Sequence, residues 1–429
     1  MAHKAKDADW GEATGAQITE EHIERARFLV GYDEALSRRE NMSVASEDHI
    51  RAYARSYGDD NPLHCDADYA GTTRWGSVTA PGTMALLICS PLKGDPRPSD
   101  IARAKKGLFQ RIHQLHSSTD WEWYRPIRPG DRIYRFAGEE SVDVKQSEFA
   151  GTSVLRVSRN VAFNQEGEVV CIQRLLLIHS GRSTAAKRGK YMAIEPAQYT
   201  DDDLAAIDAI YAAEQVRGSE PRYWEDVAIE DSLGVMAKGP LTVSDIICLH
   251  STGFALLPFG PATSRIAYKR RQKMPASFVK DSKGIPDTIM RMHWDDDWAR
   301  AVGSPMAYDY GFQRECWALQ FLTDWCGDDA IVLRMKNVTR KFNYLGDFQK
   351  VTGEVVDRRI EDGRAVVDVK VNLVSQRGET TMEAFATVAL PSRKHGEANY
   401  PDPPADIAAK AKAFLARHRE LSAETEGGR

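Results

Sequence analysis

A short run near residue 60 combines the side chains that acid–base chemistry requires. It reads Gly58-Asp59-Asp60-Asn61-Pro62-Leu63-His64, in which Asp and Asn tolerate tight turns and Pro62 fixes the chain before the histidine. The turn brings together a carboxylate (Asp59), an amide (Asn61) and an imidazole (His64), and the first and last of these can exchange protons with a bound molecule. Turns of this composition also occur where no chemistry is done.

A second element offers a place for negative charge. Ala80-Pro81-Gly82 precedes the apolar run 83–90, which we expect to form a helix that starts at Gly82. A glycine at a helix N-terminus exposes backbone N–H groups at the positive end of the helix dipole, which suits a carbonyl oxygen that gains negative charge. The first half of the chain therefore contains candidates for proton transfer and for oxyanion binding.

These features recur in the second half of the chain. The segment His64-Cys-Asp-Ala-Asp-Tyr-Ala70 matches His293-Trp-Asp-Asp-Asp-Trp-Ala299, and His64 is as far from Gly82 as His293 is from Gly311. Residues 312–325 after Gly311 have an apolar stripe at helical spacing, more typical of core than of a binding wall. The repeat predicts that the chain contains two related units.

Both units continue as β-rich sequence. Pro129-Gly130-Asp131 corresponds to Leu345-Gly346-Asp347 at a turn before a strand, and residues 165–168 correspond to 376–379 at hairpin turns. We expect strands around these turns at 154–163, 169–178, 351–359, 365–374 and 381–390. Each unit is thus an α+β fold with a central helix wrapped by a curved antiparallel sheet, and two such sheets can pair side by side.

The length of 429 residues also favours two units. We assign residues 1–19 to an N-terminal arm, 20–182 to the first repeat and 218–393 to the second repeat. The linker 183–217 contains a predicted helix, and the tail 394–429 is predicted to be helical as well.

The run Gly58-Asp59-x-Asn61-Pro62-x-His64 resembles the signature of MaoC-like (R)-specific enoyl-CoA hydratases and related dehydratases. This resemblance implies a double hot-dog fold and a 2-enoyl or 3-hydroxyacyl thioester substrate. It also implies that Asp59 and His64 activate water, that Asn61 holds the geometry and that the Gly82 N–H binds the thioester carbonyl. Coenzyme A enters as part of the substrate, and no cofactor or metal is expected.

The second repeat resembles the family more loosely, through His293, Asp295 and Gly311. Its helix at 242–252 leads into Gly253-Phe254, so the Asp-x-Asn turn is missing. His293 is more typical of a structural or binding residue, and the acidic run that begins at Asp295 is typical of a solvated helix start. In many double hot-dog hydratases the working signature lies in the C-terminal repeat, so a site that uses His293 stays open.

An insertion at 254–292 stands where the second repeat lacks its turn. It carries a basic cluster that includes Lys269, Arg270 and Arg271. The cluster fits two interpretations equally, a solvated loop or a segment that meets the phosphates of CoA.

Composition excludes several other classes of protein. The formal net charge of -5 gives no attraction to nucleic acid or to anionic membrane, and no apolar run is long enough to span a bilayer. Six scattered cysteines indicate a reducing cytoplasm and no zinc site. We expect a cytoplasmic enzyme, dimeric or pseudo-symmetric. The alternatives are a hot-dog thioesterase, which the Asp59 and His64 pair disfavours, and a non-catalytic acyl-CoA-binding subunit of a heteromeric hydratase.

Overall fold

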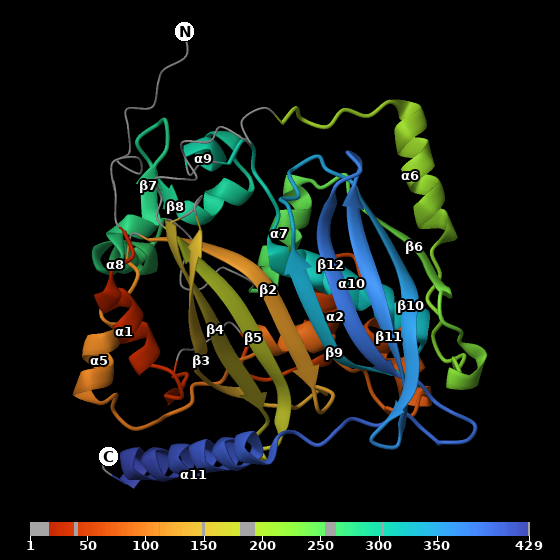
Figure 1. The fold of residues 1–429 in the computed structure, drawn as a ribbon, viewed down its shortest axis with the longest axis horizontal. Helices are drawn as coiled ribbons and strands as arrows, with labels where there is room; N and C mark the ends of the chain where they lie inside the picture. The colour runs from red at the N-terminus through yellow and green to blue at the C-terminus, as the bar shows by residue number, and fades with distance from the viewer. Residues whose placement is uncertain are drawn as a thin grey trace.

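One continuous antiparallel sheet organises the molecule. The computed structural model describes residues 17–37, 42–110, 112–147, 151–180, 194–253, 263–301 and 304–427. Ten strands pair in the order β1-β3-β4-β5-β2-β9-β12-β11-β10-β6, and β7 and β8 form a separate hairpin (Figure 1). Their bounds are β1 Asp33–Ala35, β2 His113–Trp123, β3 Tyr134–Ser147, β4 Gly151–Phe163, β5 Val169–Ser180, β6 Ser232–Lys238, β7 Phe278–Lys280, β8 Pro286–Thr288, β9 Ile331–Thr339, β10 Gln349–Glu361, β11 Arg364–Ser375 and β12 Thr380–Ala389.

The strand order shows the duplication directly. Read outward from the centre, the first repeat runs β2-β5-β4-β3-β1 and the second runs β9-β12-β11-β10-β6, so equivalent strands occupy equivalent places. The repeats join through antiparallel pairing of β2 with β9, in which Thr119 faces Asn337. The hairpin turns expected at 165–168 and 376–379 connect β4 to β5 and β11 to β12. This arrangement is a double hot-dog fold, and the predicted fold class is confirmed.

The central helix of the second repeat is α10, Gly311–Cys326. It starts at the predicted glycine and ends against Gly327, whose φ of 79° suits a glycine C-cap. Most of its residues are buried, including polar ones such as Glu315 and Gln320. Those polar residues contact the first repeat, so a single helix serves as the core of both units.

The equivalent long helix of the first repeat is absent, and the expectation of a helix across 83–90 was wrong. Only a five-residue 3₁₀ helix, η1 Gly82–Leu86, forms there. The chain leaves the helical path at Ile88, which forms a β-bridge with Met42, and the Ser90 N–H donates to the Ile133 carbonyl. Pro91 also disfavours helical backbone at Ser90. The carbonyl-binding position at Gly82 therefore lacks the long helix dipole expected for it.

Shorter helices surround the sheet. Their bounds are α1 Glu20–Phe28, α2 Glu47–Ser56, α3 Pro62–Cys65, α4 Ala67–Thr72, α5 Ser99–Lys105, α6 Asp201–Ala213, α7 Val243–Ser251, α8 Arg265–Lys273, α9 Asp296–Ala301 and α11 Ala405–Gly427, with 3₁₀ turns η3 Trp224–Asp226, η4 Pro275–Ser277 and η5 Ile289–His293. No helix in the described part of the chain is both long and apolar enough to cross a bilayer.

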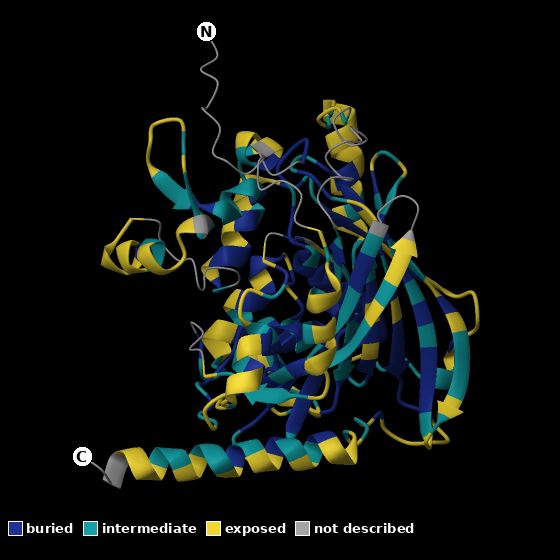
Figure 2. Ribbon diagram, turned by 60° about the vertical axis from the view of Figure 1, so that its left-hand side comes forward, coloured by how far each residue is buried: buried dark blue, intermediate teal, exposed yellow. Residues whose placement is uncertain are grey.

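The C-terminal helix α11 packs on the first repeat. Ile407, Ala411 and Leu415 are buried at helical spacing and join a cluster with Phe136 and Phe163. Figure 2 shows the opposite face of α11 exposed to solvent. The predicted helical tail is thus ordered against the strands β3 and β4, although the second repeat precedes it in the sequence.

Glu315 makes the stability of this core depend on pH. Its carboxylate accepts hydrogen bonds from Thr119 Oγ1 (2.8 Å) and Trp121 Nε1 (2.8 Å). Burial raises the pKa of Glu315 to about 7. Because the folded state then holds a proton that the unfolded state releases near pH 4.5, the free energy of unfolding falls as pH rises from that value through about 7.

We therefore expect Glu315→Gln to remove this dependence. The free energy of unfolding of the variant minus that of wild type should rise by up to about 3 kcal/mol as pH increases from about 5 to about 8. Urea unfolding across this range measures the difference. Parallel stability curves for the two proteins would contradict the assignment.

Candidate active site

The turn 58–64 is built by strong local preferences. Gly58 follows α2 with φ of 83°, a backbone conformation that glycine adopts readily. Asn61 caps α3, because its side-chain oxygen accepts from the Leu63 N–H at 3.0 Å, and Pro62 occupies the first helical position. One turn later, α3 presents His64 on its inner side. Asn61 therefore holds the geometry of the turn through the capping bond.

Asp59 is buried inside this turn. Its Oδ1 accepts from the Asn61 N–H at 3.0 Å and its Oδ2 accepts from the Tyr57 hydroxyl at 3.1 Å. Burial, together with the negative charge of Asp59, raises the pKa of Tyr57 well above its ordinary value, so Tyr57 stays a donor. The carboxylate is 1% exposed, and both of its oxygens are engaged within the turn.

Side chains of the second repeat hold the same turn from the other side. Trp317 Nε1 donates to the Tyr57 carbonyl at 3.1 Å, and Gln320 Nε2 donates to the Gly58 carbonyl at 3.1 Å. Lys238 Nζ, at the end of β6, also donates to the Gly58 carbonyl, at 3.2 Å. The site of the first repeat is therefore assembled by both repeats.

Asp324 of α10 adds a second buried carboxyl group. Asn61 Nδ2 donates to Asp324 Oδ1 at 3.3 Å. Burial and the charge of Asp59 raise the pKa of Asp324 well above its ordinary value. Sequence reasoning missed Gln320 and Asp324. Their signal was present as two polar residues four positions apart in the second half of α10, between the large apolar residues Trp317, Phe321 and Trp325.

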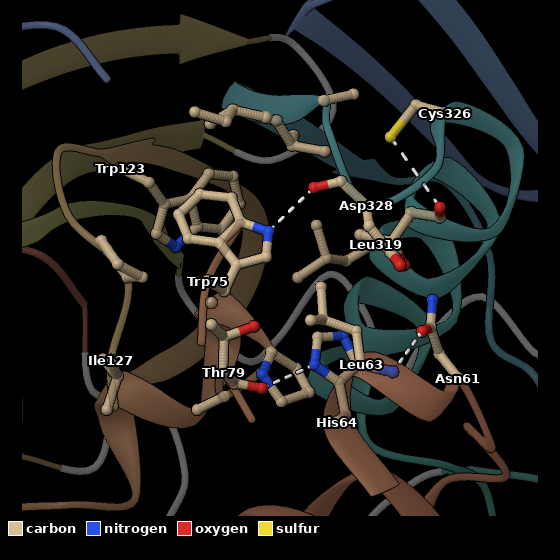
Figure 3. A pocket seen from close by; sticks show the side chains of 18 of the residues that line it. Asn61, Leu63, His64, Trp75, Thr79, Trp123, Ile127, Leu319, Cys326 and Asp328 are labelled. Atoms are coloured by element: carbon tan, nitrogen blue, oxygen red, sulfur yellow. Dashed lines mark hydrogen bonds between the residues drawn. The ribbon is translucent and has the colours of Figure 1, made fainter. Parts of the chain in front are cut away.

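His64 faces a cavity of about 90 Å³ between the two repeats. Its Nδ1 lies 2.6 Å from the Thr79 carbonyl oxygen. A carbonyl can only accept, so Nδ1 carries a proton, and in the neutral ring Nε2 then has the lone pair. Figure 3 shows His64 and Thr79 on one side of the cavity and Trp123 on another. Both repeats contribute to the lining, which includes Asn61, His64, Trp75, Gly82, Trp123, Leu319, Thr323, Cys326 and Asp328.

Gly82 lies on this cavity wall next to Trp123. A Cβ atom at position 82 would come within 2.7 Å of Trp123 Cε2, so packing alone excludes any larger residue there. Trp123 Nε1 is buried, and no described residue accepts its proton. Close packing against Trp123 therefore requires glycine at position 82, independently of any role in carbonyl binding.

The structure thus groups three of the four residues predicted for the first repeat. Asn61, His64 and Gly82 line the cavity, whereas Asp59 is not among its lining residues. The carboxyl group that does line the cavity belongs to Asp328 of the second repeat. Tyr69 donates to Asp328 Oδ2 at 2.6 Å, and burial raises the pKa of Asp328.

The second repeat reproduces the histidine but not the turn. His293 Nδ1 lies 2.8 Å from the Tyr308 carbonyl oxygen, which mirrors the bond between His64 and Thr79. Its ring packs against Tyr310, with centroids 3.8 Å apart. Burial lowers the pKa of His293 to about 4, so the ring is neutral at physiological pH. Part of the sequence that follows α7, residues 254–262, lies outside the described residues.

Asp295 and Gly311, the other two candidates of the second repeat, have contacts that are explained by local structure. Asp295 accepts from Arg291 Nε at 3.0 Å and from the Trp298 N–H at 3.1 Å, as a residue at a helix start does. At Gly311 a Cβ atom would meet only ordinary contacts of 3.8 Å, from His116 and Thr339. Packing therefore explains Gly82 but does not require a glycine at position 311.

The basic residues of the insertion lie on α8. Lys269 is exposed, and Arg270 and Arg271 are half-buried. Figure 1 places α8 on the side of the molecule where β2 starts. Trp123, on the cavity wall, is the last residue of β2. Among the described residues, no group of three His, Cys, Asp or Glu side chains could hold a metal ion.

Comparisons with known proteins agree with this architecture. Residues 37–173 match the family described as FAS1-like, dehydratase domain region. Two UPF0336 proteins, from Streptomyces avermitilis and Streptomyces coelicolor, are each 29% identical over 122 residues, which span 28% of this chain and 74% of each relative. A solved structure of a MaoC-like dehydratase superposes with a TM-score of 0.54 at 17% identity, covering 84% of this chain and 98% of that chain.

These matches confirm the predicted resemblance to MaoC-like dehydratases, and the superposition extends the shared fold over both repeats. The matched family region includes the turn 58–64 as well as Gly82 and Trp123. Hydratase or dehydratase chemistry in general is therefore supported for the first repeat.

Proposed function

We propose that this chain adds water to the C2=C3 bond of a 2-enoyl thioester, or removes it from a 3-hydroxyacyl thioester, at the cavity beside His64. One observation carries the proposal. His64 is fixed through Nδ1 to the Thr79 carbonyl, which leaves the Nε2 lone pair at a cavity that Gly82 also lines. An imidazole so oriented can take a proton from water and return it.

The reaction needs a base, a proton donor and a stabilised oxygen. His64 Nε2 takes a proton from water as the water oxygen bonds to C3. The electron pair of the C2=C3 double bond then moves toward the thioester carbonyl, and His64 returns the proton that it took from water to C2, which completes the addition. Asp59 supports these transfers from within the turn, and of the two residues it is His64 that reaches the cavity. Dehydration follows the same steps in reverse.

The thioester carbonyl is assigned to the Gly82 backbone. An N–H at this position stabilises the negative charge that develops on the oxygen. Since η1 is only five residues long, this stabilisation comes from the local hydrogen bond rather than from a long helix dipole. CoA is held as part of the substrate, and its acyl group occupies the space between the repeats.

The test is an assay of the purified chain alone with crotonyl-CoA. Loss of the enoyl absorbance with no free thiol supports a hydratase. Release of thiol would replace the proposal with a thioesterase. If a panel of straight, branched and aromatic enoyl-CoAs gave neither signal, the chain would be a binding subunit and the proposal would fail.

The basic cluster of α8 is proposed to contact the phosphates of CoA. The support is the concentration of cations at Lys269, Arg270 and Arg271 in a chain of net charge -5. Since α8 lies on the side where β2 starts and Trp123 of the cavity wall is the last residue of β2, CoA would extend along β2 to make this contact.

Changing all three residues to glutamine is expected to raise KM for acyl-CoA several-fold, and more at low salt, where charges are least screened. The turnover number stays near wild type, because these contacts are equal in the ground and transition states. Steady-state kinetics at two ionic strengths measure this, with Lys412, Arg417 and Arg419 on α11 changed likewise as the control. A KM that does not move at low salt would assign α8 to the solvated surface.

A further inference from the structure

The amine of Lys238 is buried where the two repeats meet. Lys238 is the last residue of β6 and is 7% exposed. Lysine is almost never buried without a partner. Its Nζ donates to Gln320 Oε1 at 2.6 Å and to the Gly58 carbonyl at 3.2 Å. Both acceptors are uncharged, and no described carboxylate forms an ion pair with this amine. Its positive charge is therefore available to act on groups farther away.

Four carboxyl groups surround this amine. They come from the turn of the first repeat, from α10 and from the segment after α6, and they are Asp59, Asp60, Asp324 and Glu214. Asp59 is directly bonded in sequence to Gly58, whose carbonyl the amine holds. Burial lowers the pKa of Lys238, and the charge of Asp59 opposes that change more than any other group does. The attraction is mutual, because the charge of Lys238 opposes the burial that raises the pKa of Asp324.

We propose that Lys238 is a positioning residue for the hydration reaction proposed above. Its Nζ holds the Gly58 carbonyl at 3.2 Å and so fixes the backbone next to Asp59, by which the second repeat positions the acid–base turn of the first. The inference rests on the proposed function, because it assigns Lys238 to that reaction. Lys238 is not among the residues that line the cavity, and it acts only through the turn.

This role is separable from folding. In a Lys238→Met variant the Gly58 carbonyl still accepts from Gln320 Nε2 at 3.1 Å, so it keeps a partner. Removing one charged group from a buried cluster lowers stability, so circular dichroism checks that the variant is folded before its kinetics are compared. The methionine therefore removes the charge and both hydrogen bonds of the amine, while the Gly58 carbonyl keeps its bond from Gln320.

The experiment compares wild type and Lys238→Met in the crotonyl-CoA assay across pH. We expect kcat to fall at least about tenfold with KM within about twofold, since the lysine does not line the cavity. The acidic limb of the kcat/KM profile should move to higher pH, because the variant lacks the positive charge among the carboxyl groups at this turn. A purely structural lysine would lower the rate at every pH without moving the limb.

The matched control is Lys350→Met on the neighbouring strand β10, where Lys350 is exposed and pairs with Ala237. Its kcat and pH profile should match wild type. Lys238→Gln serves as a second variant that lacks the charge, and its acidic limb should move in the same direction. A folded Lys238→Met protein with wild-type kcat and limb would overturn the inference, and so would failure of both variants to fold. An inactive wild-type chain would instead overturn the proposed function itself.

Discussion

Replacing His64 with alanine is expected to lower kcat for hydration of crotonyl-CoA by about two to four orders of magnitude. His64 is the residue on the cavity wall whose orientation leaves a basic nitrogen for water, through the 2.6 Å contact of Nδ1 with the Thr79 carbonyl. Without it, water must lose its proton to solvent. Steady-state kinetics with crotonyl-CoA measure the loss, and circular dichroism checks that the fold is kept.

His293→Ala is the informative comparison for this variant. His293 makes the same kind of bond in the second repeat, to the Tyr308 carbonyl at 2.8 Å, but it packs against Tyr310 and lacks the acidic turn. We expect its effect on kcat to be small beside that of His64→Ala. If His64→Ala kept near-wild-type turnover while His293→Ala abolished it, the active site would belong to the second repeat.

Asp59→Asn is expected to reduce hydration by about two orders of magnitude or more. The carboxylate accepts hydrogen bonds on both oxygens, from the Asn61 N–H and the Tyr57 hydroxyl. An asparagine offers one accepting oxygen and one donating nitrogen, so it removes the negative charge and mismatches one of the two donors. The loss should appear in kcat more than in KM, because Asp59 does not line the cavity.

The Asp59→Asn/His64→Ala double variant provides the check on this mechanism. Residues that act as one unit show losses that do not add, so the double variant should be little slower than the slower single variant. Losses that multiplied would mean that Asp59 and His64 act independently. In that case Asp59 would be a structural residue of the turn.

The repeat and its strands were predictable because their signals are local. Hairpin turns such as Gln165–Glu168 and Gln376–Glu379 occur between β-branched runs, and the strands on both sides formed as expected. The N-cap of α6 at Thr200 and the C-cap of α10 at Gly327 are likewise set by single residues. Periodicity and turn chemistry were sufficient for these elements.

The missing helix of the first repeat could not be predicted in the same way. Residues 83–90 are as apolar as a helix core, but α10 already supplies the long buried helix that packs against both repeats. The bridge from Ile88 to Met42 then competes with helix formation. That competition depends on tertiary contacts far apart in sequence, which a pattern within one segment does not contain.

The candidate site was predictable only in part, for a related reason. The turn around Asp59 and His64 carries a recognisable signature, whereas its supports come from the other repeat. Gln320 and Lys238 lie 262 and 180 residues from Gly58 and both hold its carbonyl. Contacts between residues so far apart in the sequence cannot be predicted from the pattern within one segment.

The most direct test of hydration at the His64 cavity is to follow the oxygen atom of water into the product. The purified chain is incubated with crotonyl-CoA in water enriched in oxygen-18, and the products are analysed by mass spectrometry. We predict that one oxygen-18 atom enters the acyl chain as a C3 hydroxyl group of an intact CoA thioester, and that His64→Ala prevents it. Oxygen-18 in the carboxylate of a free acid, with CoA released, would contradict the assignment of this cavity to hydration.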